Sequence, residues 1–400
     1  MNSQMRLSEG EIYIPNATKL DTPLADFYVL DNFLNPGECG HLIEIIKKSL
    51  RPSTITDTEE GYRTSQTCDL GGLDEPLVSD IDRRICSLLG IHPSYGEITQ
   101  GQYYEFGEEF KAHTDYFEGE TGEKHMEGGG QRTFTFMVYL NEVEAGGETE
   151  FVHLNQLINP RQGMAVIWNN LNPDGSTNHN TLHQAHPVRS GVKFIITKWF
   201  REKGDGPMFV KGPNEYVPNY TQTGFKKERL DRHLFEKIKE FYTLNSESTE
   251  PEFVEGGFVT IPETGAAGSD ILQLPEALRM EIHLSLKPVL EAWSKTELVP
   301  TAVYGIRTYK RGATLVAHRD RIETHIISVI INVDQEVEEG WPLMVEDNYY
   351  RDHHILLQPG EVVFYESGRL FHGRPAPLKG NKFANIFCHF RPREWQEVLA

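Results

Sequence analysis

The stretch that decides the fold is YYEFGEEFKAHTD at residues 103–115, because it returns in the second half of the chain as TYKRGATLVAHRD at residues 308–320. The two stretches align without gaps, and each ends in a His-x-Asp triplet. The identical positions are Tyr104, Gly107, Ala112, His113 and Asp115 in the first copy, and Tyr309, Gly312, Ala317, His318 and Asp320 in the second.

A second correspondence lies further along each copy. The run Gly191-Val192-Lys193 matches Gly380-Asn381-Lys382, and each lysine lies ten residues after a histidine, namely His183 and His372. Shared spacing at two separated places indicates that one fold is duplicated within the chain.

The sequence around the repeat is typical of β-structure. Short alternating runs such as RTFTFMVYLN and VKFIITKWF are separated by Gly, Asn and Pro turns. Strands at such spacing predict a sandwich or jelly roll. Helices are expected after the capping sequence Asn35-Pro36-Gly37-Glu38 and over residues 77–89, 227–242 and 275–293. The predicted class is mainly β with flanking helices (α+β), as two tandem double-stranded β-helix (jelly-roll) domains.

These patterns predict four segments. Residues 1–24 form an N-terminal tail, and residues 25–205 form the first domain. Residues 206–255 form a linker with a helix, and residues 256–400 form the second domain.

Composition narrows the class of protein and its partners. The chain of 400 residues carries a net charge of −20, which is poorly suited to a phosphate backbone, so no nucleic acid partner is expected. Acidity would favour a cationic peptide, although solubility alone also explains it. No apolar run is long enough to span a membrane, and the N-terminus lacks the apolar core of a secretion signal. The four cysteines are scattered, which favours a reducing, cytoplasmic compartment.

The His-x-Asp triplet predicts a metal site. Alternation along a strand puts His113 and Asp115 on one face. A distant histidine would complete a 2-His-1-carboxylate triad, the usual site of non-heme Fe(II) oxygenases. Three histidines could serve, namely His179, His183 and His186, and the offset to Lys193, mirrored in the second copy, favours His183.

The other end of such a site needs a cation if the co-substrate is 2-oxoglutarate. Lys193 stands in the apolar run VKFIITKWF, where a lysine is costly unless it is paired with an anion. Alternation places Lys193, Ile195, Thr197 and Trp199 on one face. Tyr104 and Tyr139 are suitable neutral hydrogen-bond donors.

The first half resembles the prolyl 4-hydroxylase family of Fe(II)/2-oxoglutarate dioxygenases. The resemblance covers roughly residues 25–202, through FYVLDNFLNPGECGHLI, Arg63-Thr64-Ser65, YYEFGEEFKAHTD, YLNEVEAGGETEF and TLHQAHPVRSGVKFIITKWF. It implies a jelly roll in which His113, Asp115 and His183 hold Fe(II). It also implies that Lys193 binds the 5-carboxylate of 2-oxoglutarate, helped by Tyr104 or Tyr139. O2 would be the second co-substrate, with ascorbate as an optional reductant, and the substrate would be proline in a peptide or protein.

The second half matches the family less closely. It keeps His318, Asp320, His372 and Lys382, with Tyr309 at the position of Tyr104. However, Ile331 aligns with Tyr139, and EGWPLMV aligns with GGETEF. Either the second half is a second oxygenase centre, or it is a decayed copy that docks a partner. The layout is similar to that of the ribosomal-protein prolyl hydroxylases, whose second jelly roll lacks the iron ligands. Because the ligands remain here, metal binding is favoured.

Three functions remain open at the level of sequence. The first is hydroxylation of prolyl residues in a peptide or protein. The second is hydroxylation of a free amino acid or small metabolite, for which the same core would serve. The third is a non-catalytic 2-oxoglutarate or peptide-binding module, which the intact triad disfavours.

Overall fold

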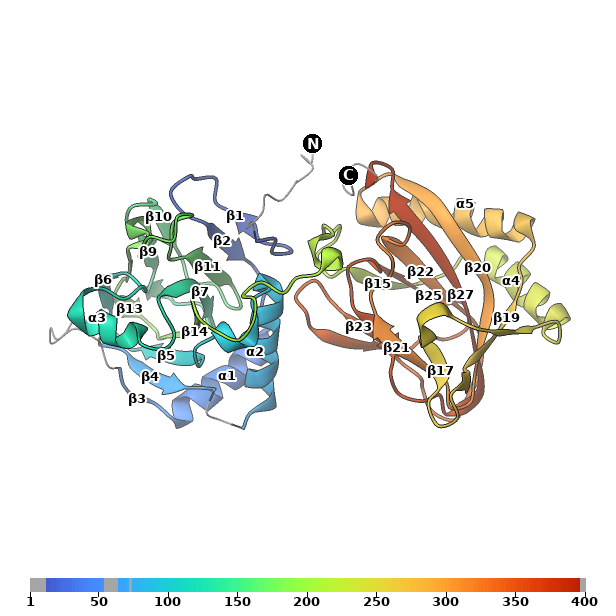
Figure 1. Ribbon diagram of the computed structural model, residues 1–400, viewed down its shortest axis with the longest axis horizontal. Coiled ribbons are helices and arrows are strands. Elements are labelled where there is room, and N and C mark those ends of the chain that lie inside the picture. Colours follow the sequence, from blue (N-terminus) through green and yellow to red (C-terminus); the bar gives the residue numbers. More distant parts are fainter. Residues whose placement is uncertain (1–11, 54–63, 72–73, 396–400) are drawn as a thin grey trace. The chain divides into compact units, whose positions relative to one another are not determined.

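The computed structural model describes residues 12–53, 64–71 and 74–395, and the chain divides into two compact units. The first unit spans Ile12–Lys211, and the second begins at Gly212. Both are mostly β-structure (Figure 1). None of the described helices is long and apolar enough to cross a membrane.

The first unit contains a large sheet and a small sheet. The large sheet has the order β1-β2-β11-β7-β14-β5-β4-β3, and the small sheet has the order β10-β9-β12-β6. The large-sheet strands, in chain order, are β1 (Thr18–Lys19), β2 (Phe27–Leu30), β3 (Arg51–Pro52), β4 (Gln66–Asp69), β5 (Gln100–Tyr104), β7 (Arg132–Tyr139), β11 (Ala165–Asn169) and β14 (Lys193–Arg201). The others are β6 (Phe110–His113), β9 (Thr149–Phe151), β10 (Gln156–Ile158) and β12 (His183–Ala185), with β8 (Ala145–Gly146) and β13 (Val188–Ser190) forming a separate pair.

Helices α1 (Pro36–Lys48), α2 (Pro76–Leu89) and α3 (Gly119–Met126) complete the first unit. The predicted capping box is present, since Asn35 Oδ1 accepts from the Glu38 amide at 3.0 Å and Glu38 Oε2 accepts from the Asn35 amide at 2.7 Å. Helix α1 packs against β5 at Gly101, where a Cβ would lie 2.5 Å from Ile46 Cγ1. This contact supports the strand that carries Tyr104.

The second unit repeats this strand order. Its large sheet runs β15-β25-β22-β27-β20-β19-β16, and its small sheet runs β18-β17-β21-β26-β23-β24. The large-sheet strands are β15 (Phe225–Arg229), β16 (Glu250–Glu252), β19 (Ser269–Leu272), β20 (Leu298–Lys310), β22 (Ile327–Val337), β25 (Glu361–Tyr365) and β27 (Gly380–Pro392). The small-sheet strands are β17 (Val259–Ile261), β18 (Ala266–Ala267), β21 (Thr314–His318), β23 (Leu343–Glu346), β24 (Asp352–Ile355) and β26 (His372–Arg374). The orders β11-β7-β14-β5 and β25-β22-β27-β20 correspond, as do β9-β12-β6 and β23-β26-β21.

Most of the segment predicted as a linker, from Gly212 onward, belongs to the second unit instead. Residues 206–255 supply β15, β16 and helix α4 (Arg232–Asn245). The helix expected from residue 227 begins only after Asp231, whose side chain accepts from the Leu234 amide, because the preceding residues pair with β25. Helix α5 (Glu276–Ser294) lies close to its predicted range.

Candidate metal and co-substrate site

The histidines of the first unit meet because their strands are neighbours. His113 ends β6, His183 begins β12, and the two are register partners with ring centroids 4.3 Å apart. Asp115 follows two residues after His113, and the ligand atoms of the three side chains all lie within 4.8 Å of one another. The structure therefore brings together the three predicted iron ligands.

Backbone carbonyls orient both imidazoles. The Lys111 carbonyl lies 2.7 Å from His113 Nδ1, and the Thr181 carbonyl lies 2.9 Å from His183 Nδ1. A carbonyl at Nδ1 fixes the tautomer that leaves Nε2 as the metal-binding atom. The other two candidate histidines lie elsewhere: His179 contacts His153, and His186 binds Glu150 at 2.8 Å.

Asp115 is held as a buried carboxylate. Burial opposes its charge, but the imidazoles of His183 and His113 and the guanidinium of Arg132 hold the pKa of Asp115 below its ordinary value. Thr135 Oγ1 donates to Asp115 Oδ2 at 2.7 Å, which leaves Oδ1 on the side of His113, 3.9 Å from its Nε2.

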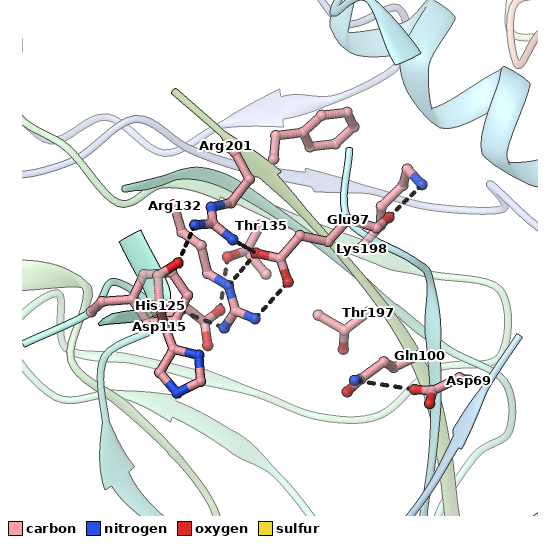
Figure 2. A network of polar contacts seen from close by, with 12 residues as sticks. Asp69, Glu97, Gln100, Asp115, His125, Arg132, Thr135, Thr197, Lys198 and Arg201 are labelled. Atoms are coloured by element: carbon pink, nitrogen blue, oxygen red, sulfur yellow. Dashed lines mark hydrogen bonds and ion pairs between the residues drawn. The ribbon is translucent and has the colours of Figure 1, made fainter. Parts of the chain in front are cut away.

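A partly buried ionic network lies next to Asp115 (Figure 2). Arg132 donates to both carboxylate oxygens of Glu97, at 2.8 and 2.7 Å, and its Nη1 lies 3.4 Å from the Asp115 carbonyl. Arg201 also binds Glu97, at 3.2 Å, and donates to the His125 carbonyl at 2.6 Å. Burial opposes the charge of Glu97, yet the two arginines lower its pKa. Sequence reasoning missed this network, because its members lie far apart in the chain and share no motif.

Lys193 forms the opposite end of the site. It lies across from Tyr104 in the β14–β5 pair, and its Nζ is 5.1 Å from the Tyr104 ring centroid and 5.5 Å from that of Tyr139. The side chain is buried, and Nζ has no hydrogen-bond partner in the described part of the chain. Burial lowers the pKa of Lys193 to about 7, although Glu148 opposes the shift. An orphaned buried ammonium fits an anionic ligand, as 2-oxoglutarate would require.

The tyrosine hydroxyls are engaged by neighbours that the sequence analysis did not single out. Tyr104 donates to Gln102 Oε1 at 3.0 Å, and Tyr139 donates to Thr149 Oγ1 at 2.6 Å. Burial raises the pKa of Tyr139, so its hydroxyl keeps its proton. Gln102 and Thr149 are therefore further candidates for contact with a ligand carboxylate.

One cavity connects the two ends. Its walls include all three candidate metal ligands, Lys193 and Tyr104, together with Ile195, Thr197 and Trp199, as strand alternation predicts. Phe110, Met137, Trp168 and Ala185 supply apolar surface. The Arg63-Thr64-Ser65 triplet begins outside the described residues, because Arg63 is not among them.

The second unit holds a corresponding group. His318 and His372 are register partners on β21 and β26, and their Nε2 atoms lie 3.4 and 3.8 Å from Asp320 Oδ1. The carbonyls of Val316 and Leu370 contact the two Nδ1 atoms at 2.7 and 2.9 Å. Burial lowers the pKa of His372 to about 4, with Asp320 opposing, so this imidazole is neutral at pH 7. The geometry matches that of the first unit.

Lys382 does not occupy the position predicted for it. In β27, Phe383 pairs with Tyr309, just as Lys193 pairs with Tyr104, whereas Lys382 pairs with Lys310. A shift of one residue turns a side chain to the other face of a strand. Lys382 accordingly binds Asp334 at 2.6 Å and is partly exposed. The ten-residue spacing from the histidine is therefore misleading in the second copy.

Of the two tyrosine positions of the second unit, one agrees with the alignment and one does not. Tyr309 is buried, as the alignment with Tyr104 implies. The counterpart of Tyr139 is Asn332 rather than Ile331, because Asn332 pairs with Asn385 as Tyr139 pairs with Ile195. Its Nδ2 donates to Asn385 Oδ1 at 3.0 Å.

Comparison with known proteins gives a consistent result. A model of the 2OG-Fe(II) oxygenase superfamily matches residues 99–201. Probable prolyl 4-hydroxylase 3 of Arabidopsis thaliana is 32% identical over 197 residues, which cover 43% of this chain and 68% of that protein. Prolyl 4-hydroxylase subunit alpha-1 of Gallus gallus is 35% identical over 168 residues, covering 40% of this chain but only 33% of that subunit. The chain thus spans about a third of the length of the chicken subunit.

A solved structure is similar to 44% of the chain. It is a viral collagen prolyl hydroxylase from Paramecium bursaria Chlorella virus 1 in complex with 2OG. It is 28% identical, covers 44% of this chain and 95% of its own, and has a TM-score of 0.37.

Proposed function

The chain belongs to the prolyl 4-hydroxylase family of 2-oxoglutarate- and Fe(II)-dependent oxygenases, and from this premise we propose that it hydroxylates prolyl residues in a peptide or protein. The observation that carries the proposal is the single cavity that joins the group His113, Asp115 and His183 to the orphaned ammonium of Lys193. Such a cavity fits a metal at one end and the far carboxylate of 2-oxoglutarate at the other.

The residues at the two ends of the cavity would have different roles. His113, Asp115 and His183 would hold Fe(II), and Lys193 would hold the 5-carboxylate, with Tyr104, Tyr139 and Thr149 as hydroxyl neighbours. With O2, the iron and 2-oxoglutarate supply the oxidation of a C–H bond, leaving succinate and CO2. Ascorbate would serve as an optional reductant.

Apolar side chains keep the iron end of the cavity dry. The Phe110 ring stacks on His113 with centroids 3.5 Å apart, and Phe151 and Trp168 pack on His183. Exclusion of water strengthens the electrostatic contacts of a bound ligand and limits side reactions.

A peptide or protein is the proposed partner, rather than a nucleic acid or a membrane. The relatives named above are prolyl hydroxylases, and the net charge of −20 disfavours a phosphate backbone. A basic prolyl segment would be attracted electrostatically.

The second unit is proposed to be a second double-stranded β-helix in tandem with the first. The support is the shared strand order of its sheets and the matched pairing of His318 with His372. A reducing, cytoplasmic location is also proposed, in keeping with four cysteines that lie buried at scattered positions of the chain. Cell fractionation would test the location.

The test incubates the full chain with Fe(II), 2-oxoglutarate, O2 and a library of proline-containing peptides. Mass spectrometry should find peptides heavier by one oxygen atom, with succinate formed in equal amount. His183→Ala should abolish the product. His186→Ala is the matched control, because His186 contacts Glu150 and lies outside the cavity. Product on a free amino acid but on no peptide would overturn the proposal.

A further inference from the structure

We propose that the second unit is a second metal-binding centre, formed by His318, Asp320 and His372, which takes a small dicarboxylate of the 2-oxo acid class anchored by Arg374. The family match at residues 99–201 does not reach this site. It is independent of the proposed function, which depends on the first unit.

The first argument is the group of metal ligands itself. The ligand atoms of the three side chains lie within 4.8 Å of one another, and backbone carbonyls occupy both Nδ1 atoms. Nδ1 contacts of this kind orient metal-ligating histidines. Asp320 Oδ2 is buried and has no hydrogen-bond partner among the described residues. In the first unit the matching oxygen of Asp115 accepts from Thr135. The imidazole of His389 faces Asp320 Oδ2, but its Nδ1 lies 3.8 Å away, beyond hydrogen-bonding distance, so this oxygen is open to a cation.

The second argument is that the buried cationic side chain of the second unit lies on a different strand from that of the first unit. In the first unit, Lys193 supplies the charge from β14, and Ala185, two residues after His183, leaves space. In the second unit, Phe383 stands at the position of Lys193, and Arg374 stands two residues after His372. The Arg374 guanidinium carbon lies 4.6 Å from the Phe383 ring centroid. The guanidinium of Arg374 therefore lies against Phe383, the residue that stands at the position of Lys193.

The third argument is that Arg374 is only partly satisfied. It is 1% exposed, donates through Nη1 to the Trp341 carbonyl and lies over the Trp341 ring. Within the described ranges its Nη2 has no hydrogen-bond partner, and the ionisable groups that act on it are Tyr309 and Tyr365 rather than a carboxylate. A buried guanidinium without an anion is costly, and its planar fork matches a carboxylate.

Lys382 does not compete for this role. Its ammonium binds Asp334, and its side chain lies on the other face of β27. Asn332 and Asn385, which hydrogen-bond to each other, stand where Tyr139 and Ile195 stand in the first unit. The second centre therefore offers amides where the first offers a tyrosine hydroxyl, and its ligand preference should differ.

Metal binding is tested on the full chain with Mn(II) as the probe, counted by equilibrium dialysis and electron paramagnetic resonance. The wild type should bind two equivalents. His113→Ala with His183→Ala should leave one, and so should His318→Ala with His372→Ala. His354→Ala is the control, because His354 is exposed on β24. One equivalent in the wild type, lost only with the first pair, would overturn the proposal.

Anion binding is tested in the His113→Ala, His183→Ala background, where only the second centre remains. With Mn(II) present, 2-oxoglutarate should bind to one site by calorimetry. Arg374→Met should weaken that binding at least tenfold while Mn(II) is retained, which also shows that the unit is folded. Arg374→Ala with Phe383→Lys, which restores the arrangement of the first unit, should recover the binding. Equal affinity in the Arg374→Met variant would overturn the assignment of the anchor.

Discussion

Lys193 lies directly opposite Tyr104 across the β14–β5 pair, with its ammonium 5.1 Å from the centre of the tyrosine ring. The pair places an unpaired buried charge next to an aromatic face, where only an anion would satisfy it. The affinity of the site for its co-substrate should therefore depend mainly on this ammonium.

Replacing Lys193 with methionine should have opposite effects on binding and on stability. The KM for 2-oxoglutarate should rise about 100-fold, since the loss of a buried charge partner costs roughly 3 kcal/mol. The cofactor-free protein should become more stable, on the order of 1–3 kcal/mol, because an unsatisfied buried group is removed. Initial rates and thermal unfolding measure the two effects. A fall in stability together with an unchanged KM would contradict the assignment.

Affinity for 2-oxoglutarate should fall as the pH rises above neutrality. Burial holds the pKa of Lys193 at about 7, against an ordinary value of 10.5. The folded, ligand-free protein therefore loses this proton near pH 7, while the unfolded chain keeps it until about pH 10.5. Affinity should drop by up to about tenfold per pH unit above 7. Calorimetry from pH 6 to 9 measures this, and Lys193→Met should flatten the profile.

Loss of the Lys193 proton affects the stability of the ligand-free protein in the opposite direction. Between pH 7 and 10.5 the unfolded state binds more protons, so this residue makes the ligand-free protein more stable as the pH rises through that window. Saturating 2-oxoglutarate should remove this contribution, because a bound carboxylate keeps Lys193 charged. Denaturant unfolding at several pH values, in wild type and in Lys193→Met, isolates it. An identical pH slope in the two proteins would argue against a buried, titrating lysine.

Thr135 should act as a positioning residue for Asp115. Thr135→Val keeps the shape but removes the donor to Asp115 Oδ2, so metal affinity in the first unit should fall about 10-fold. The matched control is Thr133→Val on the same strand, because Thr133 donates to the Phe200 carbonyl instead. Mn(II) dialysis in a His318→Ala, His372→Ala background measures the difference. Equal affinities in the two variants would mean that Thr135 does not position the carboxylate.

Ala185 should keep space open for the co-substrate. Ala185→Leu places a larger side chain in the cavity, so 2-oxoglutarate binding should weaken by at least about tenfold while Mn(II) binding is retained. Gln184→Leu is the control, because Gln184, the neighbour of Ala185 on β12, donates to Glu150 Oε2 at 2.6 Å and does not line the cavity. Calorimetry in the presence of Mn(II) separates the two ligands. Loss of metal in the Ala185 variant would indicate a distorted strand instead.

The parts of the site that sequence can predict are those with fixed spacing. His113 and Lys193 lie on strands whose alternation sets their faces, Asp115 follows two residues after the end of β6, and a duplicated motif selects His183 from three candidates. The Glu97–Arg132–Arg201 network could not be found in this way, because tertiary pairing brings its members together. The fold is similar in this respect: helix α1 follows from its capping box, whereas β15 is a strand only because β25 pairs with it.

Lys382 shows where spacing fails. An offset of ten residues after a histidine defines a face only if the intervening turn has the same length in both copies. Here the second copy is shifted by one residue, and the face reverses. The compensating Arg374 belongs to no motif shared with the first half, so no repeat comparison could have singled it out.

The pairing of His113 with His183 has a consequence for the abundance of the protein in a cell. An ion held by both would tie together two strands that are distant in the chain, and binding to the folded state alone adds about 2.7 kcal/mol when the free ion is at 100 times its dissociation constant. The folded population would then rise and fall with iron supply. Scarcity of the metal would lower the abundance of the protein through degradation, as well as its turnover, and a pulse-chase measurement under iron chelation would register both.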